Sequence, residues 1–183
     1  DGKNILPDSF ECTLLDKYED MMNFIHITEK AGVNKYIIHA RIAILAGLDP
    51  KQNRTIPPLR YDEVYRVKEE YPDLHIEING GIKTLNEIKH HLNFVDSVMI
   101  GRAVYDNPML LNENNISYEE VLKNIIQDVK QLDGKPYHYL IHTLGLFYNT
   151  KYSKLWKNCV ARTDVSEMNI ENFLEMYLKK EKS

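Results

Sequence analysis

The chain has 183 residues and a mass of 21.5 kDa, with 43% hydrophobic and 27% charged residues. This composition excludes a disordered or collagen-like chain, and the apolar runs are too short for a transmembrane helix. The formal net charge of −4 argues against a protein that is strongly basic overall, although it leaves room for a local basic patch. Two cysteines are too few for a disulfide framework and suit a reducing compartment.

The first part of the chain predicts alternating helices and strands. Apolar residues recur at helical spacing from Leu15 to Ile25, and Gly32 ends that helix. Short β-rich runs predict strands at 36–39, 75–78 and 97–100. Helices are predicted over 62–71 and after a capping box at 84–87, and the segment 42–60 reads as a long loop of the kind that usually carries function. Helices between strands imply a parallel sheet.

The last part of the chain shows only helical patterns. A second capping box at 117–120 opens a helix, and no strand is predicted beyond it. Three parallel strands cannot close a barrel, and both faces of such a sheet need covering. The sequence also begins abruptly, so we expect it to be the C-terminal part of a longer protein with a larger α/β unit.

Positive charge is concentrated late in the sequence. The stretch 135–162 contains five Lys and Arg residues and no acid, which suggests a surface that meets a polyanion. The alternative is a solvated surface whose acidic partners come from elsewhere in the chain. Lys151, Lys154 and Lys157 are three residues apart, so we expect them to share one face of a helix, with Trp156 in the core.

The ends of the three predicted strands carry residues that suit a phosphate group. The first strand ends in His39, followed closely by the cation of Arg41, and the second ends in Asn79-Gly80-Gly81. The third ends in Gly101-Arg102, which opens a short predicted helix. Ligands of βα folds bind at the carboxyl ends of strands. Each feature alone is also compatible with an ordinary turn, but three in consecutive units predict a mononucleotide phosphate site.

Several motifs together resemble the A-type tRNA-dihydrouridine synthases. The resemblance covers most of residues 33–160 and keeps both order and spacing. Its most specific part is the loop Gly-Leu-x-Pro-Lys-x-Asn-Arg at 47–54, whereas Asn-Gly-Gly and Gly-Arg also occur in many flavin and phosphate barrels. The matching segments are His39-Ala40-Arg41, 47–54, 56–59, 79–82, 98–102, Asn107-Pro108, 145–147 and Trp156-Lys157.

The resemblance implies an α/β fold: the last three strands of a (β/α)8 TIM barrel in residues 1–115, then an all-α RNA-binding domain in residues 116–183. It implies an oxidoreductase, a flavoprotein in which hydride passes from NADPH to FMN and then to a uridine in the D-loop of tRNA, forming dihydrouridine. By matching positions, FMN would be held by His39, Asn79, Gly80, Gly81, Gly101 and Arg102. The tRNA would be contacted by Lys51, Arg54, Lys154 and Lys157.

The sequence departs from the family at the catalytic cysteine. The Asn-x-Gly-Cys-Pro motif that carries it has no counterpart here, and Cys12 and Cys159 are expected to be inert. The N-terminal half of the barrel, with a further FMN-binding lysine, is also missing, so the isolated chain is expected to be inactive. No membrane partner is expected. His138 and His142 are expected one turn apart on a single helix, a metal-compatible spacing, but no third ligand is evident, so no metal is expected. His90 and His91 are expected at the surface of a helix end.

The residues are also compatible with two other interpretations. A phosphate-binding TIM-barrel isomerase or synthase would explain Gly80-Gly81 and Gly101-Arg102, but not the basic stretch. A non-catalytic RNA-binding module would explain the basic stretch, but it leaves the strand ends without a use.

Overall fold

A computed structural model describes residues 17–42, 44 and 48–182. The chain separates into two compact units, Asp1–Ile100 and Gly101–Ser183, which we call the first and second unit. Cys12, Leu15 and Gly47 lie outside the described residues. Within the described ranges, no helix has both the length and the apolar character needed to cross a membrane.

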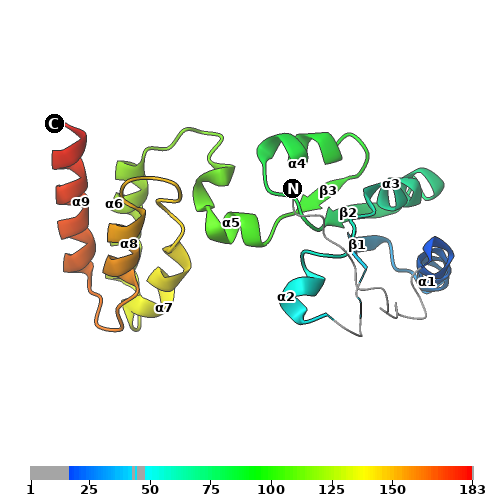
Figure 1. Cartoon of the computed structure of the whole chain (residues 1–183), viewed down its shortest axis with the longest axis horizontal. Coiled ribbons are helices and arrows are strands. Elements are labelled where there is room, and N and C mark those ends of the chain that lie inside the picture. The colour runs from blue at the N-terminus through cyan, green and yellow to red at the C-terminus, as the bar shows by residue number, and fades with distance from the viewer. Residues whose placement is uncertain (1–16, 43, 45–47, 183) are drawn as a thin grey trace. The chain divides into compact units, whose positions relative to one another are not determined.

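The first unit contains a three-stranded parallel sheet in the order β1-β2-β3 (Figure 1). Its strands are β1 (Lys35–His39), β2 (His75–Asn79) and β3 (Ser97–Met99). Its helices are α1 (Tyr18–Lys30), α2 (Pro50–Asn53), α3 (Tyr61–Glu70) and α4 (Leu85–His91). The three predicted strands and their parallel connections are therefore confirmed, and the predicted long loop contains the short helix α2.

One face of this sheet forms the core of the first unit. Successive strand residues point to opposite faces, so Tyr36, Ile76 and Ile78 share a face and are all buried. Apolar residues of α1 and α3 pack against them, including Ile25 and Val67, which are also buried. The helices thus fix the orientation of the sheet and of the residues at its carboxyl edge.

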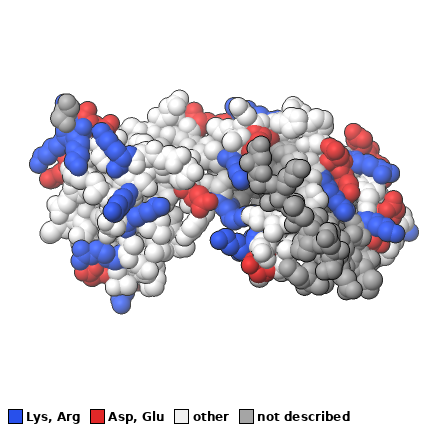
Figure 2. Space-filling model, viewed as in Figure 1, with Lys and Arg blue, Asp and Glu red and all other residues white. Residues whose placement is uncertain are grey.

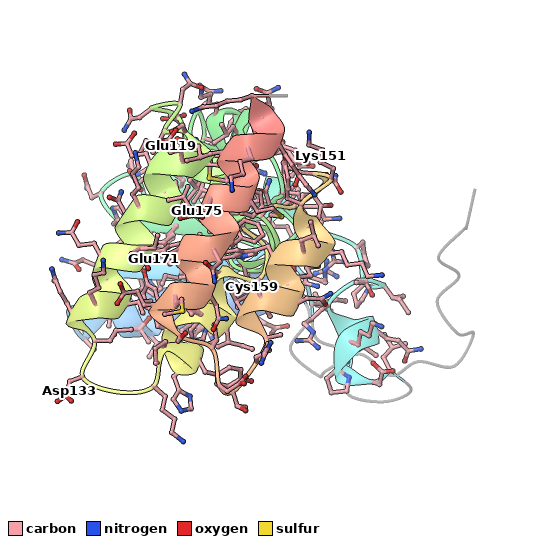
Figure 3. The ribbon with its side chains drawn as sticks, turned by 90° about the vertical axis from the view of Figure 1, so that its left-hand side faces the viewer. Glu119, Asp133, Lys151, Cys159, Glu171 and Glu175 are labelled. Carbon is pink, nitrogen blue, oxygen red and sulfur yellow. The ribbon has the colours of Figure 1, made fainter. Side chains whose placement is uncertain are left out.

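The second unit is built from helices among its described residues. They are α5 (Arg102–Asp106), α6 (Tyr118–Gln131), α7 (Pro136–Leu140), α8 (Ser153–Val160) and α9 (Glu167–Glu181), with 3-10 turns η1 (Pro108–Leu111) and η2 (Ile141–Thr143). The helix α9 packs against both α6 and α8 and lies between them in Figure 3. Phe147 and Trp156 lie at the centre of the core and are fully buried. The predicted burial of Trp156 is confirmed.

The units meet in sequence at Ile100 and Gly101, earlier than the boundary after residue 115 that the sequence suggests. The segment of α5 and η1 is grouped with the helices that follow it. The assignment of residues 1–115 to a partial barrel and 116–183 to an RNA-binding domain stays a prediction.

Three local expectations are wrong. His138 belongs to α7 and His142 to the following 3-10 turn, so they do not lie one turn apart on a single α-helix. Lys151 precedes α8 and does not share its helical face. His91 is only 3% exposed instead of lying at the surface, because Tyr61 and Tyr65 of α3 pack against its ring.

Candidate cofactor and RNA sites

The carboxyl ends of the three strands bring predicted site residues into one row. In the parallel register, His39 is the partner of Asn79, and Asn79 is the partner of Met99. The backbone continues the pairing past β1, since Ala40 donates its N–H to the carbonyl oxygen of Asn79 at 2.7 Å. The Asn79 amide nitrogen lies 2.7 Å from the Met99 sulfur. The row places an imidazole and a carboxamide side by side at the edge where ligands of βα folds bind.

The Gly80-Gly81 turn follows β2 and has a conformation that requires glycine. Both residues have positive φ, 122° at Gly80 and 72° at Gly81. A Cβ at Gly81 would lie 2.6 Å from Leu59 Cδ1 and 3.1 Å from the Tyr61 hydroxyl. That hydroxyl donates a hydrogen bond to the Gly80 carbonyl oxygen at 2.7 Å. The turn is therefore packed against the segment that precedes α3, and its shape is set by that contact as well as by its own sequence.

The His39 side chain lies close to the same turn. A Cβ at Gly80 would lie 3.5 Å from His39 Cε1. The ring is anchored at Nδ1, which lies 3.2 Å from both the backbone N–H and the carbonyl oxygen of Arg41. Nε2 has no hydrogen-bond partner within the described part of the chain. The structure thus brings His39, Asn79 and the two glycines together, as the sequence predicts.

A separate hollow of about 300 Å³ lies beside this row, between α1, the end of β1 and the start of α3. Among its described lining residues are His39 and Arg41, but not Asn79, Gly80 or Gly81. The hollow touches one end of the predicted cofactor site and does not define it.

The motif of the long loop divides into residues that build the loop and residues that project from it. Asp49 caps α2, since its carboxylate accepts from the N–H groups of Lys51 at 2.7 Å and Gln52 at 2.8 Å. Asn53 links two parts of the loop, because its side chain exchanges two hydrogen bonds with the backbone of Ile44, at 2.7 and 2.8 Å. These contacts explain why the motif contains a cap and an Asn at these positions.

The two cations of the same motif, Lys51 and Arg54, are exposed on and just after α2. Arg41, which the sequence suggested as a second cation for a phosphate, instead donates from Nη1 to the carbonyl oxygens of Thr55, at 3.1 Å, and Pro57. The loop therefore presents Lys51 and Arg54 outward, while a third cation is used to hold its backbone.

Gly101 and Arg102 begin the second unit. Gly101 is the N-cap residue of α5, its carbonyl accepts from Tyr105 N–H at 3.2 Å, and the Arg102 side chain is exposed. The helix α5 is held by close packing within this unit, because a Cβ at Gly145 would collide with the carbonyl groups of Tyr105 and Asp106. Gly145 thus has a structural role that sequence matching alone did not explain.

The basic stretch is only partly free of acidic partners. Lys151 pairs with Glu181 at 3.2 Å, and Arg162 pairs with Asp164 at 2.8 Å, so acids from beyond the stretch neutralise two of its cations. Lys154 and Lys157 are exposed one turn apart on α8 and have no ionic partner among the residues that the structure describes. On the face drawn in Figure 2, Lys and Arg side chains of this unit occur at several separate places and do not form one stripe.

Other reactive groups in the described ranges offer little chemistry. Cys159 is half-buried on α8, its thiol contacts the Asn169 carbonyl oxygen at 3.5 Å, and burial raises its pKa. A thiol in that state is a poor nucleophile and agrees with the expectation that Cys159 is inert. No group of three metal-ligating side chains occurs in the described ranges.

Sequence reasoning missed the residues that support the candidate sites. Tyr61 donates to the Gly80 carbonyl, 19 residues further along the chain, and Asn53 bonds to Ile44, nine residues earlier in the same loop. The Asn53 position had a detectable signal, since it belongs to the specific loop motif. Nothing in the sequence around Tyr61 marked its contact with Gly80, which only the folded sheet creates.

A comparison with models of protein families identifies the family of this chain. The model of the dihydrouridine synthase family matches residues 10–179, which is almost the whole sequence. The chain belongs to the dihydrouridine synthase family. The match includes both units and every residue that the sequence placed in a candidate site.

Individual relatives agree with this membership. The chain is 40% identical over 159 residues to a tRNA-dihydrouridine(20/20a) synthase of Synechocystis sp., covering 80% of this chain and 48% of the relative. It is 40% identical over 160 residues to a protein of the same name from Pasteurella multocida, covering 80% of this chain and 49% of that relative. Over a shorter segment of 96 residues, 52% of this chain and 29% of the relative, it is 51% identical to the Pseudomonas syringae protein of that name. The chain spans about half the length of the first two.

Proposed function

We propose that this chain is the FMN- and tRNA-binding C-terminal part of a tRNA-dihydrouridine synthase, and that its three strands are the last three of a TIM barrel. The observation that carries the proposal is the row of His39, Asn79 and the Gly80-Gly81 turn at one sheet edge, in a chain of this family. The whole enzyme would reduce a D-loop uridine of tRNA with NADPH as the electron donor.

The strand-end residues fit the polar end of a flavin nucleotide. A ring nitrogen of His39, the Asn79 carboxamide and the backbone of two left-handed glycines offer hydrogen-bonding groups without a carboxylate among them. We propose that His39, Asn79, Gly80 and Gly81 hold FMN in the first unit. From the family motif we assign Gly101 and Arg102 to the same cofactor, where the planar guanidinium of Arg102 suits a phosphate. Bound FMN would supply the hydride transfer.

Four cations are proposed to contact tRNA. Lys51 and Arg54 project from the long loop, and Lys154 and Lys157 project from α8. Contacts of this kind go to the phosphate backbone and set affinity and register, but they do not read bases. The reacting uridine has to leave its stack for chemistry on its ring, so these cations would hold the RNA while that base is turned out.

Among the described residues, no cysteine is placed to protonate the uridine ring. Cys159 is the one described cysteine, and burial raises the pKa of its half-buried thiol. We therefore propose that the 183-residue chain by itself binds ligands but does not form dihydrouridine. Incubation of the purified chain with NADPH, FMN and unmodified tRNA tests this, and product above background would contradict it.

Flavin binding separates this proposal from a barrel enzyme that uses a sugar phosphate. A titration followed by quenching of FMN fluorescence is expected to saturate for the unaltered chain. Arg102→Ala should weaken binding, whereas Arg66→Ala, an exposed arginine of α3 paired with Glu70, should not. Failure of the unaltered chain to bind FMN would contradict the assignment of the strand-end residues.

The salt dependence of tRNA binding distinguishes the proposed function from that of a protein that does not bind nucleic acid. Each lost phosphate contact should reduce the slope of log K against log salt by about one. We expect this for Lys154→Ala and Lys157→Ala, with a similar loss for all tRNA sequences. Lys123→Ala is the matched control, because Lys123 lies on α6 of the same unit and is paired with Glu119 at 2.6 Å. Equal effects of all three substitutions would contradict a role for α8.

A further inference from the structure

Arg41 lies two residues after β1 and is tied into the long loop rather than extended into solvent. Its side chain is half-buried, and Nη1 donates to the carbonyl oxygens of Thr55, at 3.1 Å, and of Pro57. Both acceptors lie 14 to 16 residues further along the chain. The guanidinium therefore joins the end of the strand to the far side of the loop.

The backbone around Arg41 reinforces this connection. Arg41 forms an isolated antiparallel bridge with Leu59, and Arg60 donates its N–H to the Ala40 carbonyl oxygen at 2.7 Å. The returning end of the loop is thus paired with the end of β1. The side chain of Arg41 adds hydrogen bonds to this junction. They go to the carbonyls of Thr55 and Pro57, which follow closely after Arg54.

The turn that Arg41 holds is the one that carries the exposed cations. Thr55 and Ile56 donate their N–H groups to the Gln52 carbonyl oxygen at 2.9 and 2.8 Å, and the Thr55 hydroxyl donates to the Lys51 carbonyl oxygen at 3.2 Å. The acceptors of the Arg41 guanidinium are the carbonyls of Thr55 and Pro57, next to this turn. A displacement of either carbonyl would move both cations.

We propose that Arg41 is a positioning residue: its guanidinium fixes the 51–57 segment to the end of β1, and so displays Lys51 and Arg54 to the phosphates of an RNA. The RNA part of this inference rests on the proposed function. A guanidinium suits the task because Nη1 carries two N–H donors held in one rigid plane, so this nitrogen can serve both carbonyls at once. A lysine ammonium also carries several donors, but they are not fixed in a plane, so lysine should reproduce the contact only in part.

Limited trypsin digestion tests the positioning without any RNA. Cleavage after Lys51 or Arg54 requires local opening of the loop, and its rate follows the population of the open form. We expect Arg41→Ala to accelerate these two cleavages roughly tenfold, and Arg41→Lys to recover only part of the protection. Cleavage after Lys89 in α4 of the same unit should be unchanged, and so should every rate in the matched variant Arg66→Ala. Equal acceleration at Lys89, or none at Lys51 and Arg54, would overturn the proposal.

Chemical rescue distinguishes a guanidinium contact from general damage. Added ethylguanidinium should slow the two loop cleavages in Arg41→Ala relative to cleavage after Lys89, because the small cation can occupy the vacated position between the two carbonyls. The Lys89 rate corrects for binding of the cation to trypsin itself. The ratio of loop to Lys89 cleavage should not change in Arg41→Lys or in the unaltered chain. Lack of rescue together with a lowered melting temperature would show that Arg41 acts only on overall stability, against the proposal.

A double-mutant cycle with tRNA then tests the connection to RNA. Arg41→Ala should weaken tRNA binding in the unaltered chain, but should add nothing when Lys51 and Arg54 are already alanine. An equal loss in both backgrounds would mean that Arg41 contacts RNA itself, which contradicts the proposal. If the unaltered chain binds no tRNA, the proposed function fails, and the digestion experiment still decides whether Arg41 positions the loop.

Discussion

In the second unit many aromatic rings gather around one residue, Phe147, whereas in the first unit two tyrosines of α3 use their hydroxyl groups to bond to the Gly80 turn and to His91. Phe147 contacts five other rings at centroid distances of 4.6 to 5.9 Å, among them Trp156 and Phe173. In the first unit the Tyr61 hydroxyl bonds to Gly80, and the Tyr65 hydroxyl bonds to His91 at 2.6 Å. Both units have an apolar core, but the core of the second is centred on a ring cluster, whereas in the first the tyrosine hydroxyls also fix the Gly80 turn and the end of α4.

This difference suggests how each unit serves its proposed role. Burial of rings is largely insensitive to pH and salt, which suits a helical unit that presents cations to a polyanion. Polar contacts are directional, which suits the first unit because the ends of its strands must keep a fixed geometry.

Trp156→Ala should cause the largest loss of stability. Trp156 is fully buried and donates its ring N–H to the Thr143 carbonyl oxygen at 2.7 Å. Truncation leaves a cavity and an unpaired carbonyl, which should lower the free energy of unfolding of the second unit by about 3–5 kcal/mol. Urea unfolding followed by circular dichroism measures this. The neighbouring Leu155→Ala, at an exposed position, should cost far less, and similar losses for both would argue against a ring-packed core.

Gly145→Ala should disturb the second unit by overpacking. The added methyl group would collide with the backbone carbonyl groups of Tyr105 and Asp106, so we expect a loss of about 1–3 kcal/mol. The chain has one Trp, which lies in this unit, so Trp fluorescence during urea unfolding reports the change. Gly134→Ala is the matched control in the same unit: its Cβ meets nothing within 4 Å, and its φ of 148° should cost only about 1 kcal/mol. A smaller loss at Gly145 than at Gly134 would contradict close packing of α5.

Thr84→Ala should have a moderate effect in the first unit. The Thr84 hydroxyl accepts from Glu87 N–H at 3.1 Å, and the Glu87 carboxylate accepts from the N–H groups of Lys83 and Thr84. Loss of this cap should cost about 1 kcal/mol. Thr84→Ser keeps the hydroxyl and should restore most of the stability, as measured by urea unfolding. An equal loss in both variants would mean that the methyl group of Thr84 matters and its cap does not.

Mild acid should weaken the first unit through His91. Burial, and secondarily the neighbouring His90, lower the pKa of His91, while Glu87 acts in the opposite direction. The unfolded chain therefore binds a proton more readily than the folded one, so stability present above about pH 6.5 is lost as the pH falls through the lower folded pKa. The slope of unfolding free energy between pH 7 and pH 5.5 should diminish in His91→Leu. Trp fluorescence, which reports the second unit, should show no matching change.

The elements of this fold were predictable because each depends on nearby residues. The alternation in His75–Asn79 indicates a half-buried strand, and the Thr84-to-Glu87 spacing indicates a helix start, as the structure confirms. The same local reasoning failed at His91, since α3 supplies the rings that bury it. It also failed at Lys151, whose acidic partner Glu181 lies 30 residues away at the end of α9.

The candidate cofactor site likewise has features that follow from nearby residues and features that depend on tertiary contacts. The residue types at the strand ends follow from the sequence, because a parallel sheet places those ends at one edge. The sequence could not show that Tyr61 and Leu59 support the Gly80-Gly81 turn. It also could not show that Arg41 binds loop carbonyls, since a cation beside a strand end reads equally well as a phosphate ligand.

The amino-acid sequence by itself determined the family, the order of strands and helices, and which residue types stand at the ends of the strands. Periodicity, caps and motifs are local, so they survive without knowledge of the folded chain. The tertiary structure alone decided which of the candidate lysines and arginines stay exposed and which are bound by other parts of the chain. Lys154 stays exposed, whereas Arg41 is bound by the carbonyl groups of the loop. Those partners come from residues remote in sequence, and only the packing of sheet and helices brings them within hydrogen-bond distance.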